Sequence, residues 1–211
     1  MTTIGFIGAG NIGTAVARLA VEHGHDVVLS NSRGPETLAD LVTELGPRAA
    51  ADTAEGAARR GDLVVVTVPF KAYRDVPVEP LAGKIVIDTN NYYPQRDGQF
   101  AELDEGRTTS AALLQEHLPK SRVVKAFNHI QSNHLGEHAQ PPGTENRRAL
   151  ALAADDPEAK ATVGALIDEL GFDTVDAGLL ADSWRIEPGT PGYGPRLDEA
   201  GLRDALDAAH R

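Results

Sequence analysis

Cysteine is absent from this sequence of 211 residues. Disulfides, thiolate metal sites, cysteine-ligated iron–sulfur clusters and cysteine nucleophiles are therefore excluded. Long apolar runs are also missing, and the N-terminus has no basic segment followed by an apolar stretch. Neither a membrane span nor a signal peptide is expected from such a sequence. We therefore expect a cytoplasmic protein.

Basic residues are few, because 20 Lys and Arg stand against 31 Asp and Glu, which gives a formal net charge of −11. A surface with this excess of negative charge repels phosphate backbones and anionic lipids, so we expect neither nucleic acid nor a membrane as a partner. The remaining composition, with 41% hydrophobic and 24% charged residues, is typical of a globular protein. The length fits one full domain, or one domain with a small extension.

Short apolar segments alternate with helical patterns along the chain. We predict strands over residues 3–7, 25–30, 62–68, 84–88, 122–127, 149–153 and 172–175. We predict helices over residues 14–23, 35–45, 109–118, 157–170 and 198–209. This alternation indicates right-handed βαβ units. The expected fold class is α/β, a Rossmann-type, doubly wound and mostly parallel sheet with a small C-terminal extension.

A glycine-rich loop joins the first predicted strand to the first predicted helix. Gly8, Gly10 and Gly13 have the spacing of the dinucleotide-binding fingerprint and lie in the context that it requires. In such a loop Gly8 allows the tight turn, Gly10 the approach of a pyrophosphate, and Gly13 the close packing of helix on strand. Asn11 and Ile12, between these glycines, are further predicted cofactor-binding positions, and the N-terminus of the following helix faces the anion. The alternative is a glycine-rich turn in an α/β domain that binds no nucleotide.

The end of the second strand indicates which dinucleotide is bound. NAD sites usually carry an Asp or Glu there, about 20 residues after the glycine loop, to bind the ribose 2′-hydroxyl. This chain has Ser30, Asn31, Ser32 and Arg33 instead. Hydroxyl groups and a guanidinium suit a 2′-phosphate, and no carboxylate repels it. The segment therefore predicts NADP(H) as cofactor, with a polar turn before the next helix as the alternative.

Loops beyond the carboxyl ends of the strands are expected to line the ligand cleft, as in other open α/β sheets. Phe70, Tyr92, Tyr93 and Trp184 lie in these loops, in a chain with only 5% aromatic residues. Such aromatic residues favour ring-shaped ligands. From the same loops we predict further cofactor-binding positions at Val68, Pro69, Phe70 and Asn90, and positions that orient the electron acceptor at Asn128, His129 and Arg185.

The sequence resembles the NADPH-linked reductases of the deazaflavin coenzyme F-420, which are part of a broader group of dinucleotide-binding oxidoreductases. The resemblance covers residues 3–191 and rests on the glycine loop and on Ser32-Arg33. It also rests on the sequence VVKAFN over residues 123–128 and on the Asp-Ala-Gly, Ser, Glu and Thr-Pro positions of residues 176–191. The resemblance implies a Rossmann domain that binds NADP, a small C-terminal domain, a homodimer, and hydride exchange with a flavin-like ring in the cleft between the domains.

Two features depart from that family. Where its members tend to carry a His near the end of the sixth strand, this chain has Asn128, and residues 125–130 resemble at least as closely the NADPH-binding domains of metalloreductases, which use an ordinary flavin. After Pro191 the chain is rich in Gly and Pro and ends in a short acidic helix. We expect residues 1–135 to form the NADP-binding domain, and residues 136–211 a small α/β extension whose tail packs against the cleft. The second redox partner is expected to be a deazaflavin or a flavin.

Two other functions remain open. One is a small imine, ketone or hydroxy-acid reductase, which would need a long helical C-terminal domain with a catalytic Lys, whereas Lys160 is the last Lys of this chain. The other is a non-catalytic redox sensor that binds NADPH.

The histidines and the last helix complete the sequence-based predictions. His134 and His138 have the i, i+4 spacing of metal ligands, but no third ligand completes a recognised pattern, so no metal is expected.

The last helix has an apolar side that includes Leu202 and Leu206 and must bury it on its own core or on a partner. We predict a homodimer in which the tail contributes to the interface or to the cleft.

Overall fold

A single eight-stranded sheet, in the order β3-β2-β1-β4-β5-β6-β7-β8, runs through the protein. The structure, a computed structural model, describes all of residues 1–211. Neighbouring strands are parallel, except that β7 is antiparallel to β6. The predicted Rossmann-type, mostly parallel α/β fold is confirmed. The strands are β1 (Thr3–Ile7), β2 (Asp26–Ser30), β3 (Ala49–Ala51), β4 (Leu63–Val66), β5 (Ile85–Asp88), β6 (Arg122–Lys125), β7 (Ala149–Ala154) and β8 (Asp173–Asp176).

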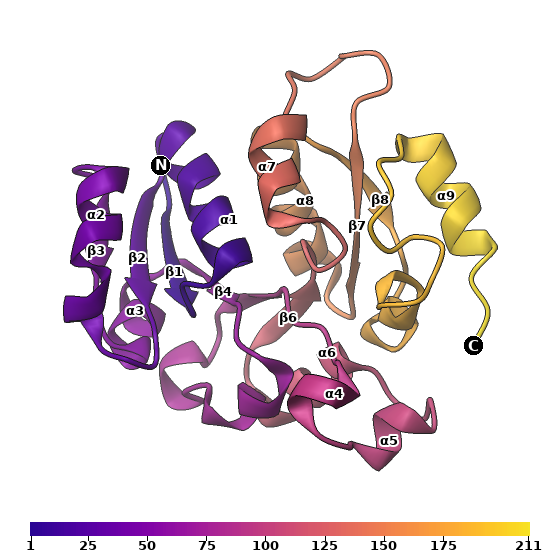
Figure 1. Cartoon of the computed structure of the whole chain (residues 1–211), viewed down its shortest axis with the longest axis horizontal. Helices are drawn as coiled ribbons and strands as arrows, with labels where there is room; N and C mark the ends of the chain where they lie inside the picture. Colours follow the sequence, from indigo (N-terminus) through magenta and orange to yellow (C-terminus); the bar gives the residue numbers. More distant parts are fainter.

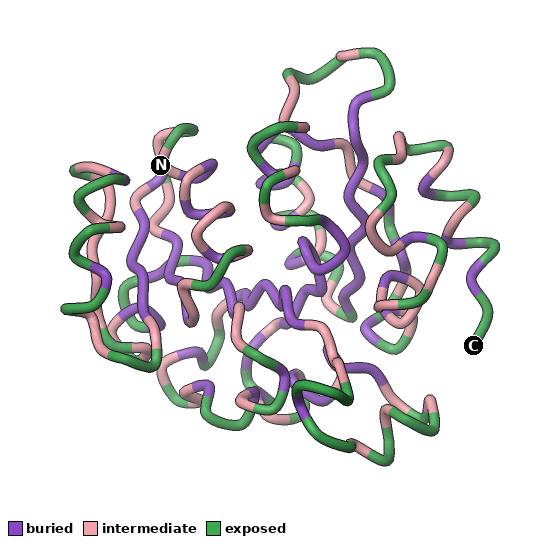
Figure 2. The backbone as a smooth tube through the Cα atoms, viewed as in Figure 1, coloured by how far each residue is buried: buried purple, intermediate pink, exposed green.

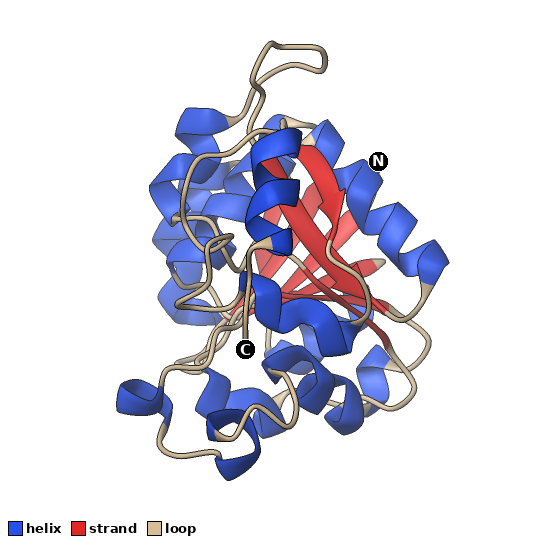
Figure 3. Cartoon of the chain, turned by 90° about the vertical axis from the view of Figure 1, so that its right-hand side faces the viewer, coloured by secondary structure: helices blue, strands red, loops and turns tan.

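Helices cover both faces of this sheet, as Figures 1 and 3 show from two directions. None of them is both long enough and apolar enough to cross a membrane. The α-helices are α1 (Asn11–Glu22), α2 (Ala39–Leu45), α3 (Ala54–Arg60), α4 (Pro94–Asp97), α5 (Ala101–Asp104), α6 (Ser110–His117), α7 (Ser132–His138), α8 (Pro157–Glu169) and α9 (Glu199–Asp207). The 3-10 helices are η1 (Pro35–Leu38), η2 (Phe70–Asp75), η3 (Glu79–Leu81) and η4 (Leu180–Ile186).

Most predicted elements are present with shifted ends. Helix α1 begins at Asn11 rather than at residue 14, because Gly10 serves as its N-cap. The strand predicted over residues 62–68 ends at Val66, three residues before Pro69, which has no N–H to offer a sheet. The sequence analysis missed β3 and α3. Their residues are mainly alanine, which supplies neither the β-branched signal of a strand nor a strong apolar stripe.

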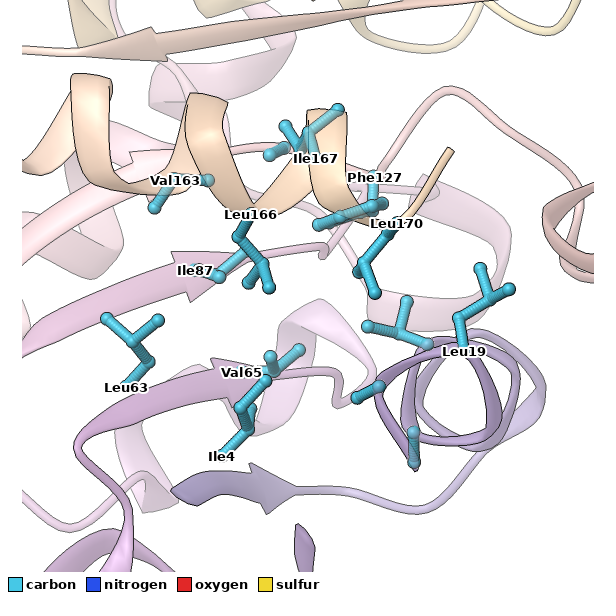
Figure 4. Close-up of a cluster of buried hydrophobic side chains, with 14 of the residues drawn as sticks. Ile4, Leu19, Leu63, Val65, Ile87, Phe127, Val163, Leu166, Ile167 and Leu170 are labelled. Atoms are coloured by element: carbon cyan, nitrogen blue, oxygen red, sulfur yellow. The ribbon is translucent and has the colours of Figure 1, made fainter. Parts of the chain in front are cut away.

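The hydrophobic core lies on both faces of the sheet, because alternate residues of each strand face opposite sides. On one face Ile4, Val65 and Ile87 belong to the same cluster as Leu19 of α1 and Leu166 of α8, and Figure 4 shows these side chains converging between the strands and the two helices. On the other face the intervening strand residues pack against α3, α6 and η2. Figure 2 shows the resulting band of buried backbone through the middle of the molecule.

The C-terminal part continues the sheet through β7, α8 and β8, a second βαβ unit that runs in the opposite direction. Helix α9 packs against this unit, beside β8 in Figure 1, and its Leu202 and Leu206 are buried among alternate residues of β7. The last helix therefore buries its apolar side on its own chain, one of the two possibilities that the sequence left open. The expected boundary between residues 135 and 136 falls within α7, and the division into two domains remains a prediction.

A buried ion pair stands at the carboxyl ends of β5 and β6. The side chains of Lys125 and Asp88 are 0% and 1% exposed, and Nζ of Lys125 lies 3.0 Å from Oδ2 of Asp88. The same ammonium donates to the Asn90 carbonyl and, at 3.0 Å, to Oγ of Ser110. The Ser110 hydroxyl in turn donates to Oε1 of Glu187 at 3.0 Å. One buried charge thus connects two strands, the first residue of α6 and the C-terminal tail.

The ion pair generates the first testable prediction. Lys125→Met retains a long side chain but leaves Asp88 buried without a counter-charge, so we expect the free energy of unfolding to fall by about 3–5 kcal/mol. Urea unfolding at neutral pH measures this change. Adding Asp88→Asn to the variant is expected to restore part of the loss, because the uncompensated charge is then removed. A single variant as stable as the wild type would show that the pair does not hold these elements together.

Candidate functional site

The three glycines of the loop between β1 and α1 are required for different reasons. Gly8 has a positive φ of 106°, and a Cβ there would lie 2.2 Å from the Thr67 carbonyl oxygen. At Gly13 a Cβ would lie 2.6 Å from Cγ2 of Thr67. No protein atom lies within 4 Å of a Cβ built on Gly10. Packing of the chain itself therefore explains Gly8 and Gly13, whereas packing does not require a glycine at position 10.

Three hollows border this loop, and one of them, of about 460 Å³, lies between α1 and the start of α7. The other two lie beyond the carboxyl ends of the strands. The side pocket, of about 450 Å³, lies on the β2 side, and the main cleft, of about 700 Å³, extends over the loops that follow β4, β5 and β6. Gly10, Thr67, Val68 and Pro69 belong to both. The side pocket is lined by Ile7, Gly8, Ala9, Gly10, Ser30, Asn31, Ser32, Ala54, Thr67, Val68, Pro69, Ala72, Asp75 and Val76. The main cleft is lined by Gly10, Asn11, Ile12, Thr67, Val68, Pro69, Thr89, Asn90, Asn91, Tyr93, Arg96, Asn128, His129, Ile130, Gln131, Ser132, Asn133, Tyr193 and Gly194.

Most residues predicted for the site line the side pocket or the main cleft, whereas Gly13, Arg33, Phe70 and Arg185 line neither. Phe70 does not, because its side chain is fully buried and stacks on Tyr73, with 4.8 Å between the ring centroids. Arg185 does not either, since its guanidinium lies over the ring of Trp184, 5.8 Å from the ring centroid. Ser30 borders the side pocket, but its hydroxyl donates to the carbonyl of β1 at 2.7 Å. These side chains are engaged by the protein itself.

Charge distinguishes the main cleft from the rest of the chain. No Asp or Glu lines it, although the chain has 31 of them, and Arg96, whose guanidinium pairs with the buried Asp97 at 2.8 Å, is the cationic residue in its lining. The first-turn N–H groups of α1 also face this region and carry a partial positive charge. The main cleft therefore favours ligands that are anionic or rich in hydrogen-bond acceptors.

Two neighbouring loops of the main cleft are fastened to each other through asparagines. Nδ2 of Asn91, after β5, donates to the Asn128 carbonyl at 2.6 Å, and Nδ2 of Asn128, after β6, donates to Oδ1 of Asn91 at 3.1 Å. Oδ1 of Asn90 accepts the N–H of Val68 at 2.9 Å, which fastens the β4 loop to the β5 loop. The cleft wall is thus built from three connected loops before any ligand binds.

Three buried side-chain atoms in this wall have no hydrogen-bond partner in the protein: Nδ2 of Asn90, Oδ1 of Asn128 and Nδ1 of His129. The residues that carry them are 3%, 3% and 2% exposed. Each unpaired buried polar atom costs about 1–3 kcal/mol. A folded protein keeps such groups where they serve a ligand or a water molecule.

His129 is neutral at physiological pH. Burial, together with the positive charges of Arg148 and Lys125, lowers the pKa of His129 to about 3. Its Nε2 accepts the backbone N–H of Ala151 at 3.1 Å, so the single ring proton resides on Nδ1.

The sequence analysis did not assign Tyr193 to the site. Its hydroxyl lies 2.5 Å from the hydroxyl of Tyr93, and the guanidinium of Arg96 stands over the Tyr93 ring at 4.9 Å. Burial and the hydrogen bond to Tyr93 raise the pKa of Tyr193 above its usual range. The Gly-Tyr-Gly sequence in a Gly- and Pro-rich segment was the available signal. Of residues 136–211, Tyr193 and Gly194 alone line the main cleft.

The paired histidines of α7 belong to a different arrangement. The rings of His134 and His138 are stacked, with 4.4 Å between their centroids. The buried guanidinium of Arg148 lies 2.7 Å from Nδ1 of His138 and 3.4 Å from Nδ1 of His134. Glu137 completes a group whose spacing would suit a metal ion. The guanidinium, however, takes the Nδ1 lone pairs and places a positive charge beside the group, which disfavours a cation.

Comparison with known proteins agrees with this geometry. A family model described as "NADP oxidoreductase coenzyme F420-dependent" matches residues 3–92. A hypothetical protein of Sinorhizobium meliloti of known structure is 32% identical, with a TM-score of 0.77 and coverage of 93% of both chains. The structure of a protein of Arthrobacter sp. FB24, titled as an F420-dependent NADP reductase, shares the fold at 24% identity, with a TM-score of 0.73, covering 85% of this chain and 86% of that one.

A curated relative extends the comparison. Metalloreductase STEAP3 of Rattus norvegicus is 30% identical over 186 residues, which are 87% of this chain and 35% of the relative. The chain spans little more than a third of the length of the curated relatives that it matches. The fold, the glycine loop and these matches define an oxidoreductase that uses NADP. The first 90 residues of this fold, from Thr3 to Tyr92, are those that the NADP oxidoreductase family model matches.

The side pocket generates a prediction about cofactor selection. Arg33 is exposed and directly follows Ser32 of the pocket lining, and its side chain makes no ion pair or hydrogen bond within the protein. If this guanidinium binds the 2′-phosphate, Arg33→Ala removes a contact worth about 1.5–3 kcal/mol, which is roughly 10- to 150-fold in NADPH affinity. NADH affinity is expected to change little. Fluorescence titration of both cofactors measures the ratio, and an unchanged ratio would exclude this role for Arg33.

Proposed function

We propose that this protein exchanges a hydride between NADP(H) and a deazaflavin or flavin ring bound in the main cleft. The observation that carries this proposal is the pair of hollows on either side of Gly10. A dinucleotide that crosses the glycine loop has its adenosine half in the side pocket and its nicotinamide half in the main cleft. The main cleft continues past that point over the β5 and β6 loops, which supports a second ring beside the nicotinamide.

The polypeptide's part in this reaction is positioning. The bound cofactors supply the hydride donor and acceptor, so no acid–base residue of the protein is obligatory. The first turn of α1 and Gly10 hold the pyrophosphate, while Val68 and Pro69 border the passage between the two hollows. The loops after β5 and β6, which Asn91 and Asn128 join, would align the two rings. A fixed alignment lowers the entropic cost of the reaction.

The residues that line the main cleft also help to choose between hydride exchange and the two alternative functions, a small imine, ketone or hydroxy-acid reductase and a redox sensor. An imine, ketone or hydroxy-acid reductase needs a proton donor close to the reacting carbon. The main cleft has no Lys, Asp or Glu in its lining, and the hydroxyls of Tyr93 and Tyr193 form a pair in which one donates to the other. This lining supports a reaction between two redox cofactors over one that needs an acid catalyst. A non-catalytic sensor would bind NADPH without turnover.

An anaerobic assay separates these functions. Purified protein is mixed with NADPH and either lumiflavin or a deazaflavin, and the absorbance of the reduced nicotinamide is followed. We expect steady oxidation of NADPH that depends on the added ring compound. NADPH binding without oxidation by either ring would instead support a sensor, and oxidation only with an added imine or ketone would support the alternative reductase.

We further propose that the protein is a cytoplasmic homodimer. Because α9 buries Leu202 and Leu206 on its own sheet, this interface is expected to form elsewhere than on the apolar side of the last helix. Light scattering of the full chain at micromolar concentration is expected to give twice the mass of the 22.3 kDa chain. A mass of one chain at that concentration would contradict the dimer.

A further inference from the structure

The main cleft offers a ligand the cationic side chain of Arg96. Arg96 lies on α4, which follows the loop after β5, and its side chain is 43% exposed. Its guanidinium contacts two other residues of the cleft lining, because it donates to the Asn91 carbonyl at 2.7 Å and stands 4.9 Å from the centre of the Tyr93 ring. The charged group, and not only the backbone that carries it, therefore belongs to the cleft wall.

The buried carboxylate of Asp97 holds this guanidinium in one orientation. Nε and Nη2 of Arg96 donate to Oδ1 and Oδ2 of Asp97 at 2.9 and 2.8 Å. The Asp97 side chain is 0% exposed and also accepts the backbone N–H groups of Tyr93, at 3.0 Å, and of Lys71, at 3.4 Å. Because the carboxylate is out of reach of solvent, a ligand can contact the guanidinium but not its counter-charge.

The guanidinium keeps unused hydrogen-bond donors. The bonds to Asp97 and Asn91 use the N–H groups of Nε and Nη2, whereas Nη1 donates to no atom of the protein. The N–H groups of Nη1 are therefore free to bind an anion. A guanidinium that the protein already holds in place loses little further freedom when a ligand binds, so less of the binding energy is spent on ordering it.

The position of Arg96 indicates which bound molecule would carry the anion. In the proposed complex the glycine loop and the first turn of α1 hold the pyrophosphate of NADP(H). Figure 1 shows α4 apart from the N-terminal end of α1, although residues of both helices line the main cleft. Arg96 thus lies away from the expected place of the dinucleotide phosphates, on the part of the cleft that is left to the second ring compound.

We propose that Arg96 binds a phosphate group on the side chain of the flavin or deazaflavin, so that the protein selects the phosphorylated form of this ring compound. Phosphate oxygens accept the N–H groups that Nη1 leaves free, and the opposite charges strengthen these bonds. The rest of the protein opposes such binding, because the chain has a net charge of −11 and repels anions at longer range. This inference rests on the proposed function and names the class of acceptor.

Two ring compounds that differ by one phosphate test the preference in the wild type. FMN carries a phosphate at the end of its side chain, where riboflavin has a hydroxyl. We expect FMN to bind at least about fivefold more tightly, the effect of an ion contact of about 1 kcal/mol. Without this contact the net negative charge of the protein would favour riboflavin. Quenching of flavin fluorescence gives both dissociation constants, and the 5-deaza forms of the two compounds are compared in the same way.

A matched pair of variants identifies the residue responsible. Arg96→Gln removes the guanidinium and keeps an amide that can donate to the Asn91 carbonyl, and we expect the ratio of FMN to riboflavin affinity to fall at least about fivefold. Arg74→Gln makes the same change at an exposed arginine outside the main cleft, whose guanidinium lies 5.2 Å from the centre of the Tyr73 ring. We expect the Arg74 variant to keep the wild-type ratio.

A double variant guards against loss of the fold. Arg96→Gln leaves the buried Asp97 without its counter-charge, which destabilises the protein. Adding Asp97→Asn removes that charge, keeps an oxygen for a backbone N–H, and restores the net charge of the wild type. We expect the double variant to show the same fall in the FMN to riboflavin ratio. Circular dichroism verifies that each variant is folded.

The outcomes distinguish this inference from the proposed function. Equal binding of FMN and riboflavin by the wild type, with NADPH oxidation intact, would overturn the recognition of a phosphate and leave the hydride exchange in place. If loss of Arg96 weakens NADPH and leaves the flavin ratio unchanged, the guanidinium binds the dinucleotide and the inference is wrong. An equal fall of the ratio in Arg74→Gln would reduce the effect to overall charge. If no flavin or deazaflavin binds or oxidises NADPH, the proposed function fails and the inference fails with it.

Discussion

The buried ammonium of Lys125 is the constraint on which the shape of the main cleft depends. A charge at this depth is tolerated only where fixed oxygens surround it. Here they come from Asp88, from the Asn90 carbonyl and from Ser110, which also bonds Glu187 of the tail. Neither the loop after β5 nor the tail can shift without uncovering the charge. The oxygens that surround the Lys125 ammonium thus hold the loop after β5, which forms part of the cleft wall, in place.

The glycine loop shows how a structural glycine differs from a functional one. Gly8 and Gly13 meet Thr67, so any side chain there collides with the protein whether or not a dinucleotide is bound. A Cβ on Gly10 would meet no protein atom, and the proposed dinucleotide supplies a reason for glycine there, because its pyrophosphate would approach the backbone. The same contrast holds for the polar atoms of the cleft. Oδ1 of Asn90 accepts the Val68 N–H, whereas Nδ2 of the same side chain has no partner in the protein.

Sequence reasoning was successful where the signal is local. The glycine loop, the buried strands and the residues that directly follow them, such as Asn128 and His129, were predictable because strand ends in a parallel sheet meet at one edge. The same rule predicted Phe70 and Arg185 to lie in the cleft, but both residues belong to short 3-10 helices. In such a helix neighbouring residues face different sides, and the rule does not say which of them faces the cleft. Tyr193 was missed because its hydrogen bond to Tyr93 spans 100 residues, and the segment that carries it has no periodicity.

The contact between the tail and the main cleft has a consequence for the diversity of such proteins. Tyr193 and Gly194 are the only two residues of the C-terminal extension in the cleft lining, and both belong to one irregular segment between η4 and α9. Segments of this kind accept insertions and substitutions more readily than strands do. Exchange of this one loop would alter the lining of the main cleft while the glycine loop stayed untouched. Relatives that share this fold can in this way change the shape of one hollow without rebuilding the other.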